Sequence, residues 1–279
     1  MAEDEAGPGS RVLVGLNDPA NMPRLLEIGA LLADEVRGEL RAFCVVGGRG
    51  GDNSFANRLL GMAGQHCTEC GASVSEPLLV EARSLQQGIL EAAAQVRPTH
   101  LVLGYSPHRE EDLEGERGFT RAVQHVARGY GGHLIVAHFG ESAGARGVLA
   151  PVVAEANLEL LGQLGRALLR RDGASLTLSH ILHDEADTAE HHAASAFLRG
   201  VAERCGFLGE VSFRVSSSSD VAEGILAMAW EFEAIIVGMT RSRSLTDRLL
   251  GSISDQVAMW ARCTTYLIRA GESQAASDE

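Results

Sequence analysis

The residues of this chain that could bind a ligand gather in one stretch rich in glycine, serine and arginine near its C-terminal end. The stretch follows Ile235–Val237, an apolar run typical of a buried strand, and it leads into a helical pattern. In open α/β folds, such turns and helix N-termini offer backbone N–H groups to anions, and arginine adds a bidentate phosphate contact. We therefore predict a phosphate or nucleotide site here. The predicted binding residues are Gly238, Thr240, Arg241, Arg243, Gly251, Ser252, Ile253 and Ser254.

Other groups of reactive residue types have simpler structural explanations. Cys67 and Cys70 lack a second cysteine pair at zinc-site spacing and are interpreted as ordinary thiols. His191 and His192 stand among acidic residues at a predicted helix start, where acids complement the helix dipole. No serine-protease triad, zinc-protease or Walker pattern is present. We predict neither a metal site nor catalytic residues.

The elements that would position the candidate site occur twice along the chain. Landmarks of one half return in the same order in the other half, at offsets of 134 to 136 residues. Such ordered recurrence indicates a duplicated unit, so the two copies can be compared position by position. The clearest pairs are Gly38 with Gly173, Cys70 with Cys205, Gly88 with Gly224, and Gly104 with Gly238.

Each copy alternates apolar strands with amphipathic helices, and several strands are apolar without alternation, as in parallel sheets buried on both faces. The pattern predicts an α/β protein with two tandem doubly wound domains of the Rossmann-like or flavodoxin-like kind. Each domain has a five-stranded, mainly parallel sheet flanked by helices. The predicted strands are 11–16, 39–46, 73–80, 99–103 and 133–138, then 147–153, 175–182, 210–215, 234–237 and 265–269. The predicted helices are 20–37, 54–69, 84–96 and 114–130, then 156–171, 186–204, 220–232 and 252–262.

The domain organisation follows from the two copies. We predict a flexible tail over 1–10, a first domain over 11–140, a linker over 141–146, a second domain over 147–270 and a flexible tail over 271–279. At 279 residues the chain is long enough for two such domains.

Composition narrows the functional class. The net charge of −13 argues against nucleic-acid binding, which requires a basic surface. All basic residues are arginines, so a phosphate site would use arginine or backbone N–H groups. No apolar run is long enough to span a bilayer and no secretory signal is visible, so we expect a cytoplasmic protein.

The wording around the candidate site resembles the universal stress protein family. In that family the last strand, loop and helix carry the pattern G-x2-G-x9-G-(S/T), which cradles the phosphates and ribose of ATP. Here Gly238 and Gly251-Ser252 match the pattern, and Arg248–Ser254 is close to the usual family wording. The resemblance covers residues 11–139 and 147–270. It implies ATP or AMP, with Mg²⁺, as the ligand of the second domain.

Some positions depart from the family pattern. Arg241 replaces the middle glycine, and Val153 stands where the family has an aspartate that contacts the nucleoside. In the first copy this position is Asn17, and the acids Glu110–Asp112 would repel a triphosphate. We therefore expect the first site to be degenerate and the second to be partly retained.

The leading hypothesis is a non-enzymatic tandem sensor or regulatory protein, as expected for a stress-response family, that binds an adenine nucleotide in its second domain. The alternative is an interaction or regulatory module without nucleotide, such as the cytosolic domain of an amino-acid or cation transporter, where tandem relatives occur. Slow ATP hydrolysis is a third alternative, with the least support, because no general base or metal-binding carboxylate follows the loop in sequence.

Two further expectations concern packing. In the family, two domains pair through their last strands, so we expect residues 133–138 and 264–269 to pair within the chain as a pseudo-dimer. A homodimer of tandem chains is also expected. Trp230 falls near an apolar helix face and is expected to belong to the core.

Overall fold

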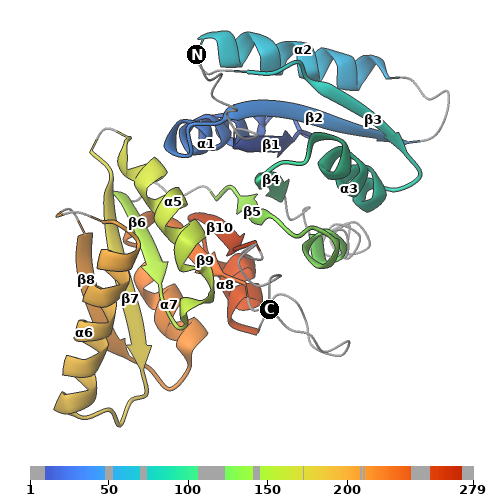
Figure 1. The fold of residues 1–279 in the computed structure, drawn as a ribbon. Coiled ribbons are helices and arrows are strands. Elements are labelled where there is room, and N and C mark those ends of the chain that lie inside the picture. Colours follow the sequence, from blue (N-terminus) through green and yellow to red (C-terminus); the bar gives the residue numbers. More distant parts are fainter. Residues whose placement is uncertain are drawn as a thin grey trace, which may run out of the picture. The chain divides into compact units, whose positions relative to one another are not determined.

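The computed structural model contains two compact units, Met1–Leu103 and Gly104–Glu279 (Figure 1). The residues that the structure describes are 10–47, 53–69, 74–105, 123–140, 145–171, 173–207, 209, 211–239 and 252–271. None of the helices in these ranges is both long and apolar enough to cross a membrane.

The first unit holds a parallel sheet with the strand order β3-β2-β1-β4. Helices α1 and α2 contact each other, and α3 packs against β2 and β3. Its strands are β1 (Arg11–Gly15), β2 (Glu39–Gly47), β3 (Leu78–Ala82) and β4 (His100–Tyr105). Its helices are α1 (Met22–Glu35), α2 (Ser54–Glu69) and α3 (Leu85–Val96).

The second unit repeats this order and extends it, as β8-β7-β6-β9-β10-β5. All neighbours are parallel except β10 and β5. The strands are β5 (His133–His138), β6 (Ala145–Pro151), β7 (Ser175–Leu182), β8 (Val211–Ser217), β9 (Phe232–Gly238) and β10 (Thr264–Arg269). The helical segments are 123–129, η1 (Glu155–Asn157), α5 (Leu158–Leu169), α6 (Thr188–Arg204), α7 (Val221–Ala229) and α8 (Ser252–Trp260).

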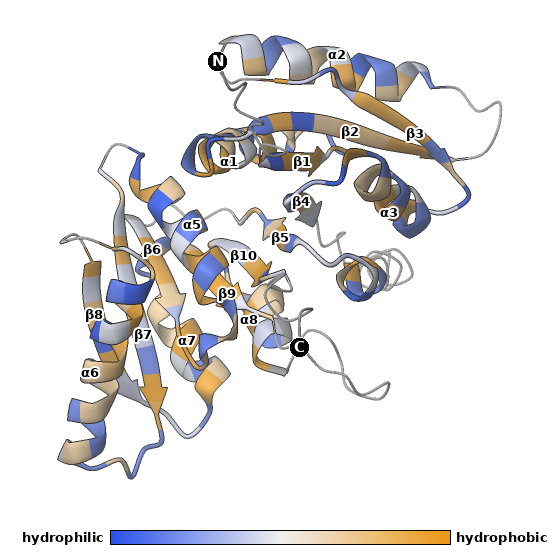
Figure 2. Cartoon of the chain, viewed as in Figure 1, coloured by the Kyte–Doolittle hydropathy of each residue, from blue (hydrophilic) through white to orange (hydrophobic). Residues whose placement is uncertain are grey.

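Sequence pattern explains the layers. The chain moves outward from β6 through β7 to β8, and then returns to β9 and β10 on the other side of β6. Because βαβ crossovers are right-handed, α5 and α6 cover one face of the sheet, whereas α7 and α8 cover the other. In Figure 2 hydrophobic colours concentrate on the central strands, and the helices alternate between hydrophobic and hydrophilic residues. The mixed α/β class with a mainly parallel sheet and flanking helices is confirmed.

The last strands of the two repeats pair as expected, since β5 lies antiparallel to β10. His133 and Thr264 begin these strands and lie 131 residues apart. With that offset Val136 and Leu267 are equivalent positions, and they face each other in the ladder. The seam is therefore locally symmetric about this pair, like the interface of an isologous dimer.

Glycines close both ends of this seam. A Cβ on Gly140 would collide with the carbonyl of Arg262, and a Cβ on Gly271 would lie 2.9 Å from the carbonyl oxygen of Gly131. Gly140 and Gly271 are also 131 residues apart, as are Gly131 and Arg262. The close approach thus obeys the same local symmetry as the strands. Arg269, buried at the end of β10, donates hydrogen bonds to the carbonyls of Tyr130 and Gly132.

Two local predictions are corrected by the structure. The helix predicted over 220–232 ends at Ala229, and Phe232 begins β9. The prediction that Trp230 belongs to the core is wrong, because its side chain is 75% exposed beyond the helix end. The predicted repeat boundary at 141–146 stays a prediction. The compact units group β5 with the strand that it pairs with, which does not reveal where a duplicated unit began.

Candidate functional site

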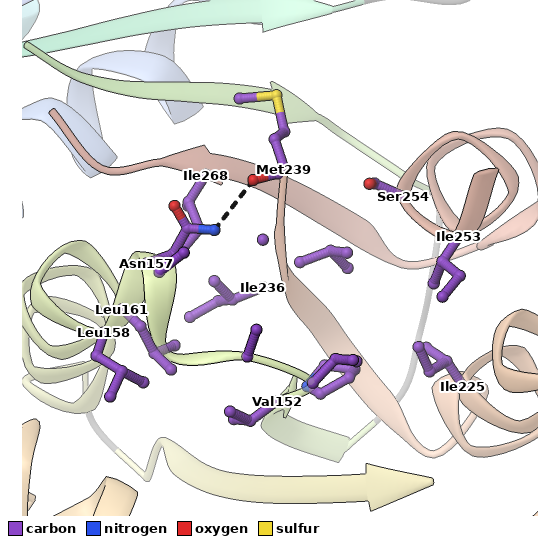
Figure 3. A pocket seen from close by; sticks show the side chains of 16 residues that line it. Val152, Asn157, Leu158, Leu161, Ile225, Ile236, Met239, Ile253, Ser254 and Ile268 are labelled. Carbon is purple, nitrogen blue, oxygen red and sulfur yellow. Dashed lines mark hydrogen bonds between the residues drawn. The ribbon is translucent and has the colours of Figure 1, made fainter. Parts of the chain in front are cut away.

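The candidate site lies in the second unit where the connections from neighbouring strands diverge. β6 and β9 are neighbours, but the chain leaves β6 toward β7 and leaves β9 toward β10. In open α/β sheets the crevice beyond the carboxyl ends of two such strands is the usual ligand position. A cavity of about 440 Å³ opens there (Figure 3).

The wall of this cavity is almost entirely aliphatic. Its described lining contains no charged side chain, and Asn157 and Ser254 are its only polar side chains. An apolar wall of this kind favours a flat or aliphatic group and disfavours a buried charge. The lining residues are Pro151, Val152, Val153, Ala154, Ala156, Asn157, Leu158, Leu161, Ile225, Ile236, Val237, Gly238, Met239, Ile253, Ser254 and Ile268.

Asn157 forms one corner of the cavity and ties three segments together. It precedes α5, yet its side chain does not cap that helix. Its Nδ2 donates to the carbonyl of Met239, 3.1 Å away (Figure 3), and its Oδ1 accepts from the N–H of Ala270 at 2.9 Å. The amide therefore fixes the ends of β9 and β10 against the start of α5.

The same amide explains one glycine at the site. A Cβ on Gly238 would lie 2.6 Å from Nδ2 of Asn157. Gly238 therefore has a packing role that does not require a ligand, although it lines the cavity as predicted.

Val153 follows β6 and is 60% exposed where it lines the cavity. An exposed valine gives this part of the wall no hydrogen-bond acceptor. The preceding residue, Val152, is held by its neighbours: its N–H donates to the carbonyl of Ser179, and Nδ1 of His180 lies 2.7 Å from its carbonyl oxygen. The strand end is thus fixed while Val153 faces solvent.

The N-terminus of α8 reaches the opposite side of the cavity. The helix begins at Ser252, and the next two residues, Ile253 and Ser254, line the cavity. Figure 3 shows the Ser254 side chain, which is buried, beside the cavity. A helix N-terminus has free N–H groups and a positive dipole end, so it suits an anionic part of a ligand.

The predicted binding residues fall into two groups. Gly238, Ile253 and Ser254 line the cavity, and Ser252 begins α8. Thr240, Arg241, Arg243 and Gly251 lie outside the described residues, so their predicted phosphate contacts stay a prediction.

Sequence reasoning missed Asn157, because its partners lie about 80 and 110 positions further along the chain. A faint signal existed: Asn157 matches Asn21 at an offset of 136, and each precedes the first helix of its repeat.

The first repeat uses the corresponding strand end differently. Asn17 is exposed, and Asp18 stabilises the turn before α1: its Oδ1 accepts from the N–H of Ala20 and its Oδ2 accepts from Nδ2 of Asn21. The first-copy loop, 106–122, lies outside the described residues.

The cysteine and histidine groups have structural explanations where they are described. Burial raises the pKa of the Cys44, Cys205 and Cys263 thiols to about 11, which keeps them protonated at neutral pH. Asp187 and Glu190 form a reciprocal capping box at the start of α6, which accounts for acids beside the histidine pair. Across the described ranges no cluster of three or more His, Cys, Asp or Glu side chains is placed to hold a metal.

Comparison with known proteins agrees with this architecture. The model of the universal stress protein family matches residues 110–269, more than half of the chain. The cytoplasmic domain of a prokaryotic cation chloride cotransporter has a similar fold, with a TM-score of 0.62 and 13% identity over 95% of this chain and 98% of that one. A universal stress protein from Archaeoglobus fulgidus gives a TM-score of 0.61 and 16% identity over 95% and 97%. At these identities the likeness shows the fold alone. No curated protein sequence matches the chain significantly.

Proposed function

Because this chain belongs to the universal stress protein family, we propose that it is a non-enzymatic regulatory protein whose second repeat binds an adenine nucleotide. The observation that carries the proposal is the cavity between the carboxyl ends of β6 and β9. It stands at the ligand position of this fold class, and its wall suits a planar base.

The two sides of the site favour different parts of a nucleotide. The aliphatic wall excludes charge and accepts the base, whereas the N-terminus of α8 favours an anion. Arg241 and Arg243 belong to the segment that leads into this helix, and in sequence they are suited to bidentate phosphate contacts. The described lining offers no carboxylate or histidine that could serve as a general base, which favours binding over hydrolysis.

Calorimetric titration with ATP, AMP and Mg²⁺ tests the proposal when it is combined with paired variants. Val153→Trp places an indole at an exposed wall position, so it should block the cavity without disturbing the core. Asn17→Trp makes the matching change in the first repeat, where the residue is also exposed. Heat that Val153→Trp abolishes and Asn17→Trp leaves intact would support a site in the second repeat. Binding that survives Val153→Trp and the Arg241→Ala/Arg243→Ala variant would place the site elsewhere.

The second candidate is an interaction module without nucleotide, and one observation favours it. Val153 gives the cavity wall an apolar side chain where a nucleoside hydroxyl would need an acceptor. The whole-length likeness to the cytoplasmic domain of a cation chloride cotransporter suggests a membrane transporter as the partner. Absence of heat with every nucleotide, together with copurification of a transporter from native membranes, would favour this candidate.

A further inference from the structure

Both tryptophans of the chain lie at the surface of the second unit, at the ends of two neighbouring helices. Trp230 directly follows α7 and is 75% exposed, while Trp260 ends α8 and is 68% exposed. Met259 beside it is 70% exposed. The two helices contact each other, and each runs from the carboxyl edge of the sheet to its amino edge. The three side chains therefore share one end of the helix pair, and we call them the tryptophan patch.

The first repeat shows that the fold does not require this patch. With the offset of 131 that aligns β5 with β10, Val126 matches Val257, and both are fully buried. The buried side of the two helices is therefore the same, while the exposed side differs. Met259 corresponds to Arg128, Trp260 to Gly129, and Trp230, aligned through Gly88 and Gly224, to Ala94.

The area and chemistry of the patch suit the centre of a protein interface. At their exposures the two indoles present roughly 300 Å² of surface. Monomers seldom expose contiguous apolar patches beyond a few hundred Å², and a stable dimer buries about 800 Å² per partner. Tryptophan and methionine are enriched in interface centres, and tryptophan is a frequent hot spot. The patch thus provides the apolar centre, and its polar surroundings would provide the rim.

We propose that the tryptophan patch joins two copies of this chain in an isologous dimer. Homodimer interfaces are the more apolar class, which fits a surface of two indoles and a thioether. Self-pairing places each apolar side chain against another, and a patch that occurs in one repeat only closes the assembly at two copies. β10 is already paired on both sides, with β9 and β5, so its edge is not open to a second chain. The net charge of −13 also disfavours an anionic lipid surface as the occupant.

The charge gives the dimer a distinctive salt dependence. Two chains that each carry −13 repel one another over distances comparable to the Debye length. Added salt screens this repulsion and leaves the apolar contact in place, so dimerisation strengthens as ionic strength rises. A partner held mainly by charge would show the opposite dependence.

Sedimentation velocity of the full chain over a concentration series tests the proposal. The wild type should change from monomer to dimer, with a dissociation constant that falls as salt is added. Trp230→Ala combined with Met259→Arg introduces residues of the first repeat and should weaken dimerisation at least about tenfold. Met62→Arg is the matched control, because Met62 is an exposed methionine in the first unit and should leave the dimer intact.

Indole fluorescence provides a second readout, since both tryptophans belong to the patch. Dilution of the wild type should shift the emission to the red and increase acrylamide quenching as the dimer dissociates. A chain that stays monomeric at its highest soluble concentration would overturn the proposal. So would a dimer that the double variant leaves unchanged. A monomer whose emission shifts to the blue with anionic phospholipid vesicles would reassign the patch to a membrane.

Discussion

At the scale of single residues, Asn157 does most to shape the cavity. Its side chain bonds the backbone after β9 and after β10, and its position determines that residue 238 has no Cβ. The amide lies among aliphatic side chains with both ends satisfied, so it contributes order at the cavity wall without leaving an unpaired polar group there.

Gly238→Ala should destabilise the protein by about 1–3 kcal/mol, because the new methyl group would overlap Nδ2 of Asn157. Gly200→Ala in the interior of α6 is the control, since nothing lies within 4 Å of its added Cβ. The control should be neutral or stabilising by up to about 1 kcal/mol, from helix propensity alone. Urea denaturation of both variants measures the difference. Equal stability of the two would show that Asn157 moves aside freely.

The buried thiols predict a loss of stability at alkaline pH. Burial raises the pKa of Cys44, Cys205 and Cys263 from 9.0 to about 11, so folding favours their protonated form. That contribution is complete below pH 9.0 and is lost as the pH rises toward about 11. The pH dependence of the urea midpoint measures it, and Cys263→Ala should flatten the slope in this window. A slope that none of the three Cys→Ala variants alters would assign the alkaline loss to other groups.

At the scale of elements, the seam between β5 and β10 determines how the repeats are joined. The ladder is antiparallel and symmetric about Val136 and Leu267, and glycines allow close approach at both ends. A single chain thereby covers the edge of β10 that two separate domains would have to cover by association.

Gly140→Ala should weaken this seam, because its Cβ would collide with the carbonyl of Arg262. We expect a loss of about 1–3 kcal/mol and faster amide hydrogen exchange in β5 and β10. Gly131→Ala is the control, because its added Cβ meets no atom within 4 Å. Unchanged exchange in β10 of the Gly140 variant would mean that the backbone there adjusts without cost.

The elements show how far sequence alone could reach. β7 was predicted with its observed bounds, because apolar residues and flanking turns mark both ends. β3 was predicted at 73–80 and lies at Leu78–Ala82, since its pairing with β2 decides which part of an extended segment joins the sheet. The end of α7 was misplaced because apolar residues continue from the helix through Trp230 into β9.

The cavity shows the limit more sharply. The position of the site follows from strand order, and Gly238, Ile253 and Ser254 were identified from their motif. The aliphatic wall and the Asn157 contacts depend on side chains from η1, α5, α7 and β10 that meet only after folding. No local pattern specifies such a meeting, so sequence predicted the polar side of the site and missed its apolar side.

At the scale of the whole molecule, the repeats share one strand order and differ in what they present. The second unit has a cavity at the switch point and an exposed tryptophan patch. In the first unit the matching positions are Asn17 at the strand end and Ala94 at the helix end. Duplication thus preserved the core and allowed the surfaces to diverge, which is how one live site per chain would arise.

The number of nucleotides bound per chain tests this account most directly. Equilibrium dialysis of the wild-type chain with radiolabelled ATP, with and without Mg²⁺, measures that number without reference to heat or stability. The account predicts saturation at about one ATP per chain, with Val153→Trp reducing it to none. Saturation at two per chain would contradict the degeneracy of the first repeat, and no saturable binding would contradict the nucleotide site itself.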